Sequence, residues 1–205
     1  MTNATHRPRL PRAERREQLL DVTKEIVGEH GLHAVSIDRV AREAGVSRPI
    51  IYEHFNDLGG LLNALLDREG NRALAQLATF MPTAAGEGTE LLDVLLAALT
   101  GYLEAVRSDP ITWQLMLMPP EGAPEFLRER VEQARAAVVA QLAALVEQAF
   151  EPWGGQRTPD PELTAYSMST LADTWARLLL TDPDRFDLER ILVHARWALA
   201  RFAPS

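Results

Sequence analysis

Residues 36–55, SIDRVAREAGVSRPIIYEHF, combine side chains that can read DNA with the spacing of two short helices. Arg48 can bind guanine through two hydrogen bonds, and Ile50 can contact the methyl group of thymine. Tyr52 and His54 can reach the phosphates on either side of the bases. An isoleucine beside these polar residues is unusual on a solvated helix face but typical of a face that enters a DNA groove. We therefore interpret the stretch as a candidate DNA-binding surface.

Local signals along this stretch predict how those side chains are held. Ser36 is placed to cap a first helix, and Gly45 to end it in a tight turn. Ser47 is placed to cap a second helix, with Pro49 in its first turn. The apolar residues that would pack the two helices together recur at helical spacing: Ile37, Val40, Ala41, Ala44, Ile51 and Phe55. This pattern predicts a helix-turn-helix.

The stretch 41–55, AREAGVSRPIIYEHF, is similar to the DNA-binding module of TetR-type transcriptional regulators. The core pattern of that family is A-x-x-A-G-V-S-x-x-x-(I/L)-Y-x-(H/Y)-F, and the similarity extends back to Gly31 and Ser36 and on to Leu61 and Leu62. The resemblance implies an N-terminal three-helix DNA-binding module and a larger helical domain. With the side-chain chemistry, it indicates these DNA-contacting residues: Ser36, Ser47, Arg48, Pro49, Ile50, Tyr52 and His54.

The chain departs from the family pattern just after this module. Leu58 stands where family members commonly carry a lysine that reaches phosphate, and Gly59 and Gly60 are expected to weaken the start of the next helix. Glu53 carries a carboxylate that repels phosphate unless it accepts a hydrogen bond from cytosine. We expect the arginines near the N-terminus to supply the missing positive charge.

Positive charge is concentrated at the N-terminal end, although the net charge of the chain is −8. Residues 1–16 contain five arginines and one acidic residue, so this end is suited to phosphates while the rest of the chain repels them. The charge pattern equally fits a disordered basic leader on an acidic globule. We expect a basic flexible arm at 1–11, a helix-turn-helix domain at 12–56 and a ligand-binding and dimerisation domain at 57–205.

The remaining sequence predicts an all-α fold with about nine helices in total. Apolar residues recur at helical spacing, and Gly, Pro and Asp residues separate the segments. A first helix is expected at 12–30, and a Pro-initiated short helix is expected after Asp109. The longer helices are expected at about 57–80, 90–108, 124–150, 162–180 and 187–202.

Several functional classes find no support in the sequence. Cysteine is absent, which excludes disulfides and thiolate metal sites. No apolar run approaches the roughly 20 residues that span a membrane, and the N-terminus lacks the features of a signal peptide. No nucleophile elbow, P-loop, dinucleotide fingerprint or Glu-x-x-His pair occurs. We therefore expect a cytoplasmic protein that is not an enzyme, with no cofactor, metal or membrane partner.

Aromatic and methionine residues gather in the middle helices of the larger domain. They fit an ordinary helical core, and they also fit the lining of an apolar pocket. The TetR resemblance implies an effector pocket here, and the preferred lining residues are Tyr102, Trp113, Met116 and Phe126. Because no dense positive cluster is visible, an apolar or aromatic small-molecule effector is favoured over a highly anionic one.

The last two helices carry apolar and small residues that can be buried within the chain or against a second copy. The resemblance implies a homodimer in which these helices pair with their copies. The residues concerned are Leu163, Tyr166, Ser167, Thr170, Leu171, Thr174 and Leu178, continued by Leu188, Ile191, Leu192, Ala195, Leu199 and Phe202.

The function expected from these features is that of a ligand-responsive transcriptional regulator. It would act as a repressor, bind a palindromic double-stranded DNA operator as a dimer, and be released by its effector. The sequence does not distinguish a repressor from an activator. The alternative is a helical ligand-carrying or protein-binding bundle whose helix-turn-helix is vestigial.

Overall fold

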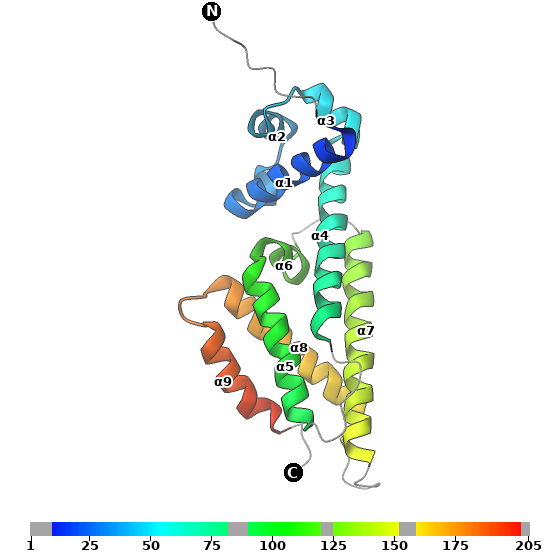
Figure 1. The fold of residues 1–205 in the computed structure, drawn as a ribbon, viewed down its shortest axis with the longest axis vertical. Helices are drawn as coiled ribbons and strands as arrows, with labels where there is room; N and C mark the ends of the chain where they lie inside the picture. Colours follow the sequence, from blue (N-terminus) through cyan, green and yellow to red (C-terminus); the bar gives the residue numbers. More distant parts are fainter. Residues whose placement is uncertain (1–9, 82–89, 120–124, 152–158, 202–205) are drawn as a thin grey trace, which may run out of the picture. The chain divides into compact units, whose positions relative to one another are not determined.

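The computed structural model describes residues 10–81, 90–119, 125–151 and 159–201. Within these ranges the chain forms nine α helices and one short 3₁₀ helix and contains no strand (Figure 1). The all-α fold expected from the helical spacing is therefore confirmed. The chain divides into two compact units, Met1–Arg68 and Glu69–Ser205, and each is described by itself below.

The N-terminal unit is held together by one hydrophobic core. It contains α1 (Arg12–His30), the 3₁₀ helix η1 (Leu32–Ala34), α2 (Ile37–Ala44), α3 (Arg48–Phe55) and the first turns of α4 (Leu58–Phe80). Each of these α helices repeats apolar side chains on one face, and that face contributes to the core. Burying each large aliphatic side chain contributes roughly 1.5–3 kcal/mol. The buried members include Leu19, Leu20, Ile26, Val40, Ile51, Phe55, Leu61 and Leu65.

The N-terminal unit extends to Arg68, beyond the domain boundary expected at residue 56. Leu61 and Leu65 of α4 are completely buried in its core. Arg68 donates hydrogen bonds to Glu17 at 3.1 Å and to Asp21 at 2.8 Å, both on α1. The compact unit continues past residue 56 because the break in helix before Leu58 does not interrupt the core, and the expected domain boundary stays a prediction. Helix α4 begins in one unit and ends in the other.

Glycines are required at two turns of this unit. Gly45 ends α2 with a φ of 67°, a left-handed conformation that glycine adopts without strain. Gly60 lies in the first turn of α4, where its N–H donates to the Asp57 carboxylate at 2.7 Å. A Cβ atom at Gly60 would overlap the carbonyl oxygen of Phe55. Gly60 is therefore required by close packing, whereas the expected weakening of the helix start stays a prediction.

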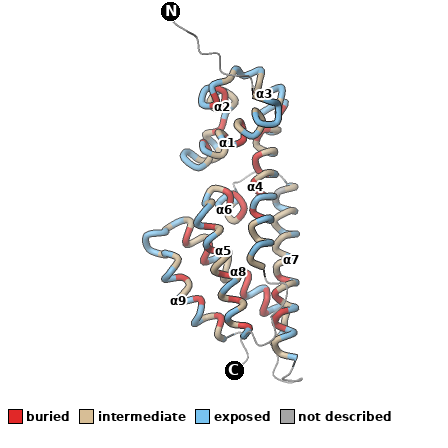
Figure 2. Tube along the Cα trace, viewed as in Figure 1, coloured by how far each residue is buried: buried red, intermediate tan, exposed pale blue. Residues whose placement is uncertain are grey.

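The C-terminal unit is a helical bundle built around α5 and α8. It contains the rest of α4, with α5 (Leu91–Ser108), α6 (Pro110–Leu117), α7 (Glu125–Phe150), α8 (Pro161–Thr181) and α9 (Leu188–Leu199). Helices α5 and α8 contact each other, and each also contacts α6, α7 and α9. Their buried faces recur along each helix in Figure 2, and α8 carries the completely buried Ala165 and Ala176. These small side chains allow neighbouring helices to approach closely.

The long helices begin within one residue of the positions expected from the sequence. Asp160 and Asp187 cap α8 and α9, accepting hydrogen bonds from the N–H groups of Leu163 and Arg190 at 3.0 and 2.8 Å. Helix α9 ends at Leu199, earlier than the residue 202 that was expected and that lies outside the described ranges. In the described part of the chain, no helix combines the length and apolar character needed to cross a membrane.

Candidate DNA-reading face and apolar cavity

Helix α3 presents a mixed polar and apolar surface outside the core of the N-terminal unit. Ile51 and Phe55 are buried, as their spacing predicted, and they fix the rotation of the helix. Tyr52 is 48% exposed although it is large and aromatic. The other residues expected on this face, Ser47, Arg48 and Pro49, are exposed, whereas Ile50 and His54 are half-buried at its edges. Glu53 is also exposed. We call these five residues, together with Tyr52 and Glu53, the reading face, which comprises Ser47–Ile50 and Tyr52–His54.

Arg48, the residue best suited to bind a base, makes an ion pair within the N-terminal unit. Its Nε atom contacts the Oδ1 atom of Asp38, in the first turn of α2. Both side chains are more than half exposed, at 64% and 58%, so the pair is accessible to a ligand. The Asp38 carboxylate is also favourably placed near the positive N-terminal end of α2. Its pairing with Arg48 depends on the angle at which the turn sets α3 against α2.

The two serines that precede the helices behave differently. The Ser36 hydroxyl oxygen accepts a hydrogen bond from the N–H of Arg39 at 3.2 Å, so it caps α2 as expected. Ser47 is the N-cap residue of α3 but makes no capping hydrogen bond with its side chain. The exposed Ser47 hydroxyl is therefore not engaged in holding the helix start.

Positive charge from α1 lies beside the reading face. The Arg16 guanidinium lies 4.7 Å from the centre of the Phe55 ring, and Arg12 donates a hydrogen bond to the Glu53 carbonyl oxygen at 3.4 Å. The pKa of His54 is lowered from 6.5, chiefly because burial disfavours the imidazolium and secondly because Arg12 repels it. His54 is thus more readily neutral in the free protein than an exposed histidine.

Leu58, the position where the family has a lysine, packs against the core of the N-terminal unit. It is half-buried, so an apolar contact replaces the charged side chain. Asp57 still caps α4 through the N–H of Gly60. Arg12 and Arg16 of α1 therefore supply positive charge beside the reading face. Residues 1–9 of the arm expected at 1–11 lie outside the described residues.

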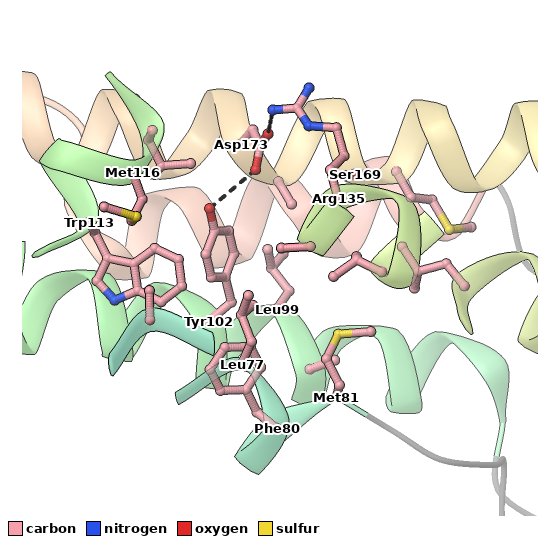
Figure 3. Close-up of a pocket in the computed structure, with 18 of the residues that line it drawn as sticks. Leu77, Phe80, Met81, Leu99, Tyr102, Trp113, Met116, Arg135, Ser169 and Asp173 are labelled. Atoms are coloured by element: carbon pink, nitrogen blue, oxygen red, sulfur yellow. Dashed lines mark hydrogen bonds and ion pairs between the residues drawn. The ribbon is translucent and has the colours of Figure 1, made fainter. Parts of the chain in front are cut away.

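The C-terminal unit encloses an apolar cavity of about 150 Å³. Side chains from α4 to α8 line it, with Leu199 of α9 (Figure 3). Three of the four residues expected to line a pocket do so: Tyr102, Trp113 and Met116. Phe126 is not among the lining residues; it is half-buried near the start of α7. Phe80 of α4, which belongs to the same aromatic cluster in the sequence, also lines the cavity. The sequence had not indicated the contribution of α8, because no periodicity shows which apolar faces surround a common space.

The aromatic side chains of the cavity are held in a fixed arrangement. The rings of Tyr102 and Trp113 meet edge to face with 5.1 Å between their centres, and Phe80 lies 6.1 Å from Tyr102 on its other side. The indole N–H of Trp113 donates to the side-chain oxygen of Gln76 at 2.8 Å. Such contacts restrict the rotamers of the rings, so the rings form a fixed part of the cavity wall.

Three polar side chains, one each from α5, α7 and α8, interrupt the mostly apolar wall. The Tyr102 hydroxyl donates to one carboxylate oxygen of Asp173 at 3.2 Å, and Arg135 contacts the other oxygen at 2.7 Å (Figure 3). The pKa of Tyr102 is raised well above 10, first by burial and then by the negative charge of Asp173. Tyr102 therefore keeps its proton and remains a donor to Asp173.

Helices α8 and α9 expose large apolar side chains outside the bundle core. Leu163 and Tyr166 of α8 are 67% and 47% exposed, and Val193 and Trp197 of α9 are 70% and 61% exposed. We call these four residues the α8–α9 apolar face. Ser167, Thr170 and Thr174 of α8 are also exposed, as an interface role requires, and Leu171 and Leu178 are half-buried.

Most of the α9 residues expected at a dimer interface are not exposed on the surface of the chain. Ile191, Ala195 and Leu199 are buried within the chain, while Leu188 and Leu192 are half-buried. Their spacing marks the face that packs on the bundle, so the outward face belongs to Val193 and Trp197 instead. Phe202 lies outside the described residues.

Comparison with known proteins agrees with this architecture. Residues 19–65 match the model of the bacterial regulatory proteins of the tetR family. Over 108 residues the chain is 32% identical to the HTH-type transcriptional activator FasR of Mycolicibacterium smegmatis, covering 53% of this chain and 48% of FasR. The chain therefore matches only about half the length of that curated relative.

Solved structures of the same class cover nearly the whole chain. A TetR-like transcriptional regulator from Rhodococcus sp. RHA1 superposes with a TM-score of 0.72 at 23% identity, over 94% of this chain and 97% of that one. A tetR-family transcriptional regulator from Streptomyces coelicolor superposes with a TM-score of 0.66 at 26% identity, over 94% and 82%. The fold and the N-terminal motif define a helix-turn-helix regulator. Residues 19–65 carry the DNA-binding domain of the TetR family, and the chain as a whole shares the fold of solved TetR-like regulators.

Proposed function

We propose that this protein is a ligand-responsive transcriptional repressor that binds a palindromic DNA operator as a homodimer. The observation that carries the proposal is the reading face of α3, where Tyr52, Arg48 and Pro49 are exposed directly over the buried Ile51 and Phe55. A helix held rigidly from behind and bearing such a face is suited to the major groove. Action on DNA also places the protein in the cytoplasm.

We assign the residues of this face to two roles. Arg48, Pro49 and Ile50 contact base edges, because they occupy the first turn of the recognition helix. Ser47, Tyr52 and His54 contact phosphates and fix the position of the protein on the duplex. Ser36 accepts a bond from its own helix, which leaves its hydroxyl hydrogen to donate to phosphate.

The α8–α9 apolar face supports the homodimer. Exposed large apolar side chains, with exposed threonine and serine on the same helix α8, are typical of an association surface. Two copies related by a twofold axis would present their recognition helices to successive major grooves, about 34–36 Å apart on one face of the DNA. A palindromic operator follows from that symmetry.

The cavity of the C-terminal unit supports release by a small effector. Its mostly apolar lining suits an apolar or aromatic molecule, held by Tyr102, Trp113 and Met116. An effector weakens DNA binding only if it binds the DNA-competent conformation less tightly than the other one.

The decisive experiment selects DNA sites from a random library with the full-length protein and measures affinity against salt concentration. We expect an inverted repeat and a steep fall in affinity with salt, since each neutralised phosphate contributes to the slope. A chain that binds no DNA at low salt would instead support the alternative of a ligand-carrying bundle with a vestigial helix-turn-helix. A promoter fusion carrying the selected site then distinguishes repression from activation.

A further inference from the structure

The charged side chains that line the cavity are already engaged. Among the described lining residues these are Arg130 and Arg135 of α7 and Asp173 of α8. Arg135 contacts one carboxylate oxygen of Asp173 at 2.7 Å, so these two charges balance each other. Arg130 donates a hydrogen bond to the side-chain oxygen of Asn71 at 3.4 Å and has a further interaction. The described lining therefore offers no free counter-charge to a charged ligand, and burying an unpaired charge costs free energy.

Ser169 of α8 brings a hydroxyl group to the cavity without using it to hold the helix. It lines the cavity with only 9% of its surface exposed, and its hydroxyl forms no hydrogen bond with any described residue. A buried hydroxyl without a partner costs free energy, which a partner inside the cavity would recover. Three other hydroxyl groups of α8 donate to the carbonyl oxygen four residues earlier, at 2.9, 2.8 and 2.8 Å: those of Ser167, Thr174 and Thr181.

The polar groups near Ser169 supply donors rather than free acceptors. Asp173 lies one helical turn further along α8, and its two oxygens are engaged by Tyr102 and by Arg135 (Figure 3). The Arg135 guanidinium has five N–H groups and no acceptor, and its Nη2 atom is the one that contacts Asp173. The Ser169 hydroxyl can also donate. A ligand atom at this point therefore gains most by accepting a hydrogen bond.

The volume of the cavity limits the size of its ligand. An apolar cavity of about 150 Å³ holds a molecule of about the size of benzene. The indole ring of Trp113 and the aliphatic side chains of Leu77 and Leu99 form part of the wall (Figure 3). The atoms of the ligand away from Ser169 must therefore be few and apolar.

We propose that the cavity binds an uncharged apolar molecule of about one ring in size that carries a single carbonyl oxygen, to which Ser169 donates a hydrogen bond. This inference rests on the effector role proposed above and narrows the chemical class of the effector. The Arg135–Asp173 ion pair stays intact in such a complex. A carboxylate would instead compete with Asp173 for Arg135, and a cation would compete with Arg135 for Asp173.

The test compares probes that share a benzene ring with a planar substituent of one size: acetophenone, α-methylstyrene, benzoate and benzamidinium. Their dissociation constants for the full-length protein are measured at neutral pH by ligand-observed NMR titration. We expect acetophenone to bind at least about tenfold more tightly than benzoate or benzamidinium, because only these two bury an unpaired charge. Equal or tighter binding of a charged probe would overturn the inference, and so would a failure of acetophenone to bind.

Ser169→Ala tests the hydrogen bond to the carbonyl oxygen. It should weaken acetophenone binding about threefold to tenfold and leave α-methylstyrene binding within about twofold, because this hydrocarbon has the same shape but no acceptor. Comparing each probe between the two proteins cancels the difference in hydrophobicity between the probes. Ser108→Ala is the matched control, since Ser108 is exposed at the end of α5 and does not line the cavity. Equal effects of Ser169→Ala on the two probes would overturn the assigned contact.

Asp173→Asn tests the charge balance. It removes the counter-charge of Arg135 but keeps the size of the side chain and an oxygen that accepts from Tyr102. Benzoate should then bind at least about fivefold more tightly than it does to the unchanged protein, while acetophenone binding should stay within about twofold. Thermal unfolding checks that the variant is folded. An unchanged benzoate affinity in the folded variant would contradict the argument that the ion pair excludes carboxylates.

The outcome is distinguishable from that of the proposed function. If acetophenone binds through Ser169 while saturating acetophenone leaves DNA affinity unchanged, the carbonyl site stands and the release mechanism is wrong. If a charged probe binds best and releases DNA, the effector role stands and the inference of an uncharged ligand is wrong.

Discussion

Arg48 meets Asp38 at the N-terminal edge of the reading face, and this contact determines how the arginine is presented. We predict that Arg48→Ala lowers the preference for operator over unrelated DNA by about tenfold, since a lost two-bond contact to guanine costs about 1–3 kcal/mol. Competition binding measures this preference. Tyr52→Phe is the control and should weaken all sequences alike, because phosphates carry no sequence information.

Asp38→Asn tests whether the ion pair orients Arg48. We expect unrelated DNA to bind more tightly, because a negative charge next to phosphate is removed, while the preference for operator falls. In the double variant with Arg48→Ala, the loss of preference should not exceed that of Arg48→Ala alone. Additive losses would show that Asp38 acts independently of Arg48.

Gly60 gives a test of close packing at a single residue. Gly60→Ala should lower the free energy of unfolding by roughly 1–3 kcal/mol, because the new methyl group overlaps the Phe55 carbonyl oxygen. Gly59→Ala is the matched control, because its Cβ would meet only the Asp57 carboxylate at 3.3 Å, and its effect should stay within about 0.5 kcal/mol. Urea denaturation of the full chain measures both. Equal stabilities of the two variants would contradict the packing argument.

His54 makes DNA affinity depend on pH. Its pKa in the free protein lies below 6.5 owing to burial and Arg12, and a neighbouring phosphate in the complex would raise it. Because the complex then binds a proton more tightly than the free protein, affinity should increase as pH falls through about 6.5 and be nearly constant above about 7.5. His54→Gln should remove this dependence. A wild-type profile unchanged by that substitution would exclude the phosphate contact.

At the scale of elements, the serines before α2 and α3 have different roles. Ser36 stabilises the start of its helix, whereas Ser47 makes no capping bond and is placed to contact DNA. Ser36→Ala should destabilise the protein by about 1 kcal/mol, because it removes the hydrogen bond to the Arg39 N–H. Ser47→Ala should leave stability nearly unchanged, because Ser47 makes no capping bond, but should weaken DNA binding. Thermal unfolding and DNA titration of the two variants compare these effects. A large loss of stability in Ser47→Ala would contradict the distinction.

At the scale of the whole molecule, DNA binding depends on the α8–α9 apolar face. Trp197→Arg should raise the dimer dissociation constant at least about tenfold and weaken operator binding with it, because central aromatic residues contribute about 2 kcal/mol or more to interfaces. Sedimentation velocity measures the association. Glu104→Arg, at an exposed position of α5, is the control and should leave the dimer intact. A Trp197→Arg protein that remains dimeric would place the interface elsewhere.

The sequence by itself determined the local features of this protein. Helix starts at Ser36, Asp160 and Asp187 follow from side chains that bond to backbone groups only a few residues away. The buried side of α3 follows from the spacing of Ile51 and Phe55, and the helix-turn-helix follows with it. These properties depend on neighbours in the chain, so the sequence contains all that decides them.

Only the tertiary structure decided which distant residues meet. Asp38 pairs with Arg48, Asp173 joins Tyr102 and Arg135, and the extension of the N-terminal core to α4 moves the unit boundary to Arg68. Trp197, rather than Ile191, faces outward on α9, since both sides of that helix are apolar and packing alone selects one. Helical periodicity reports that a face is apolar. It does not report which partner covers that face, because the partner is separated in sequence and brought close only by folding.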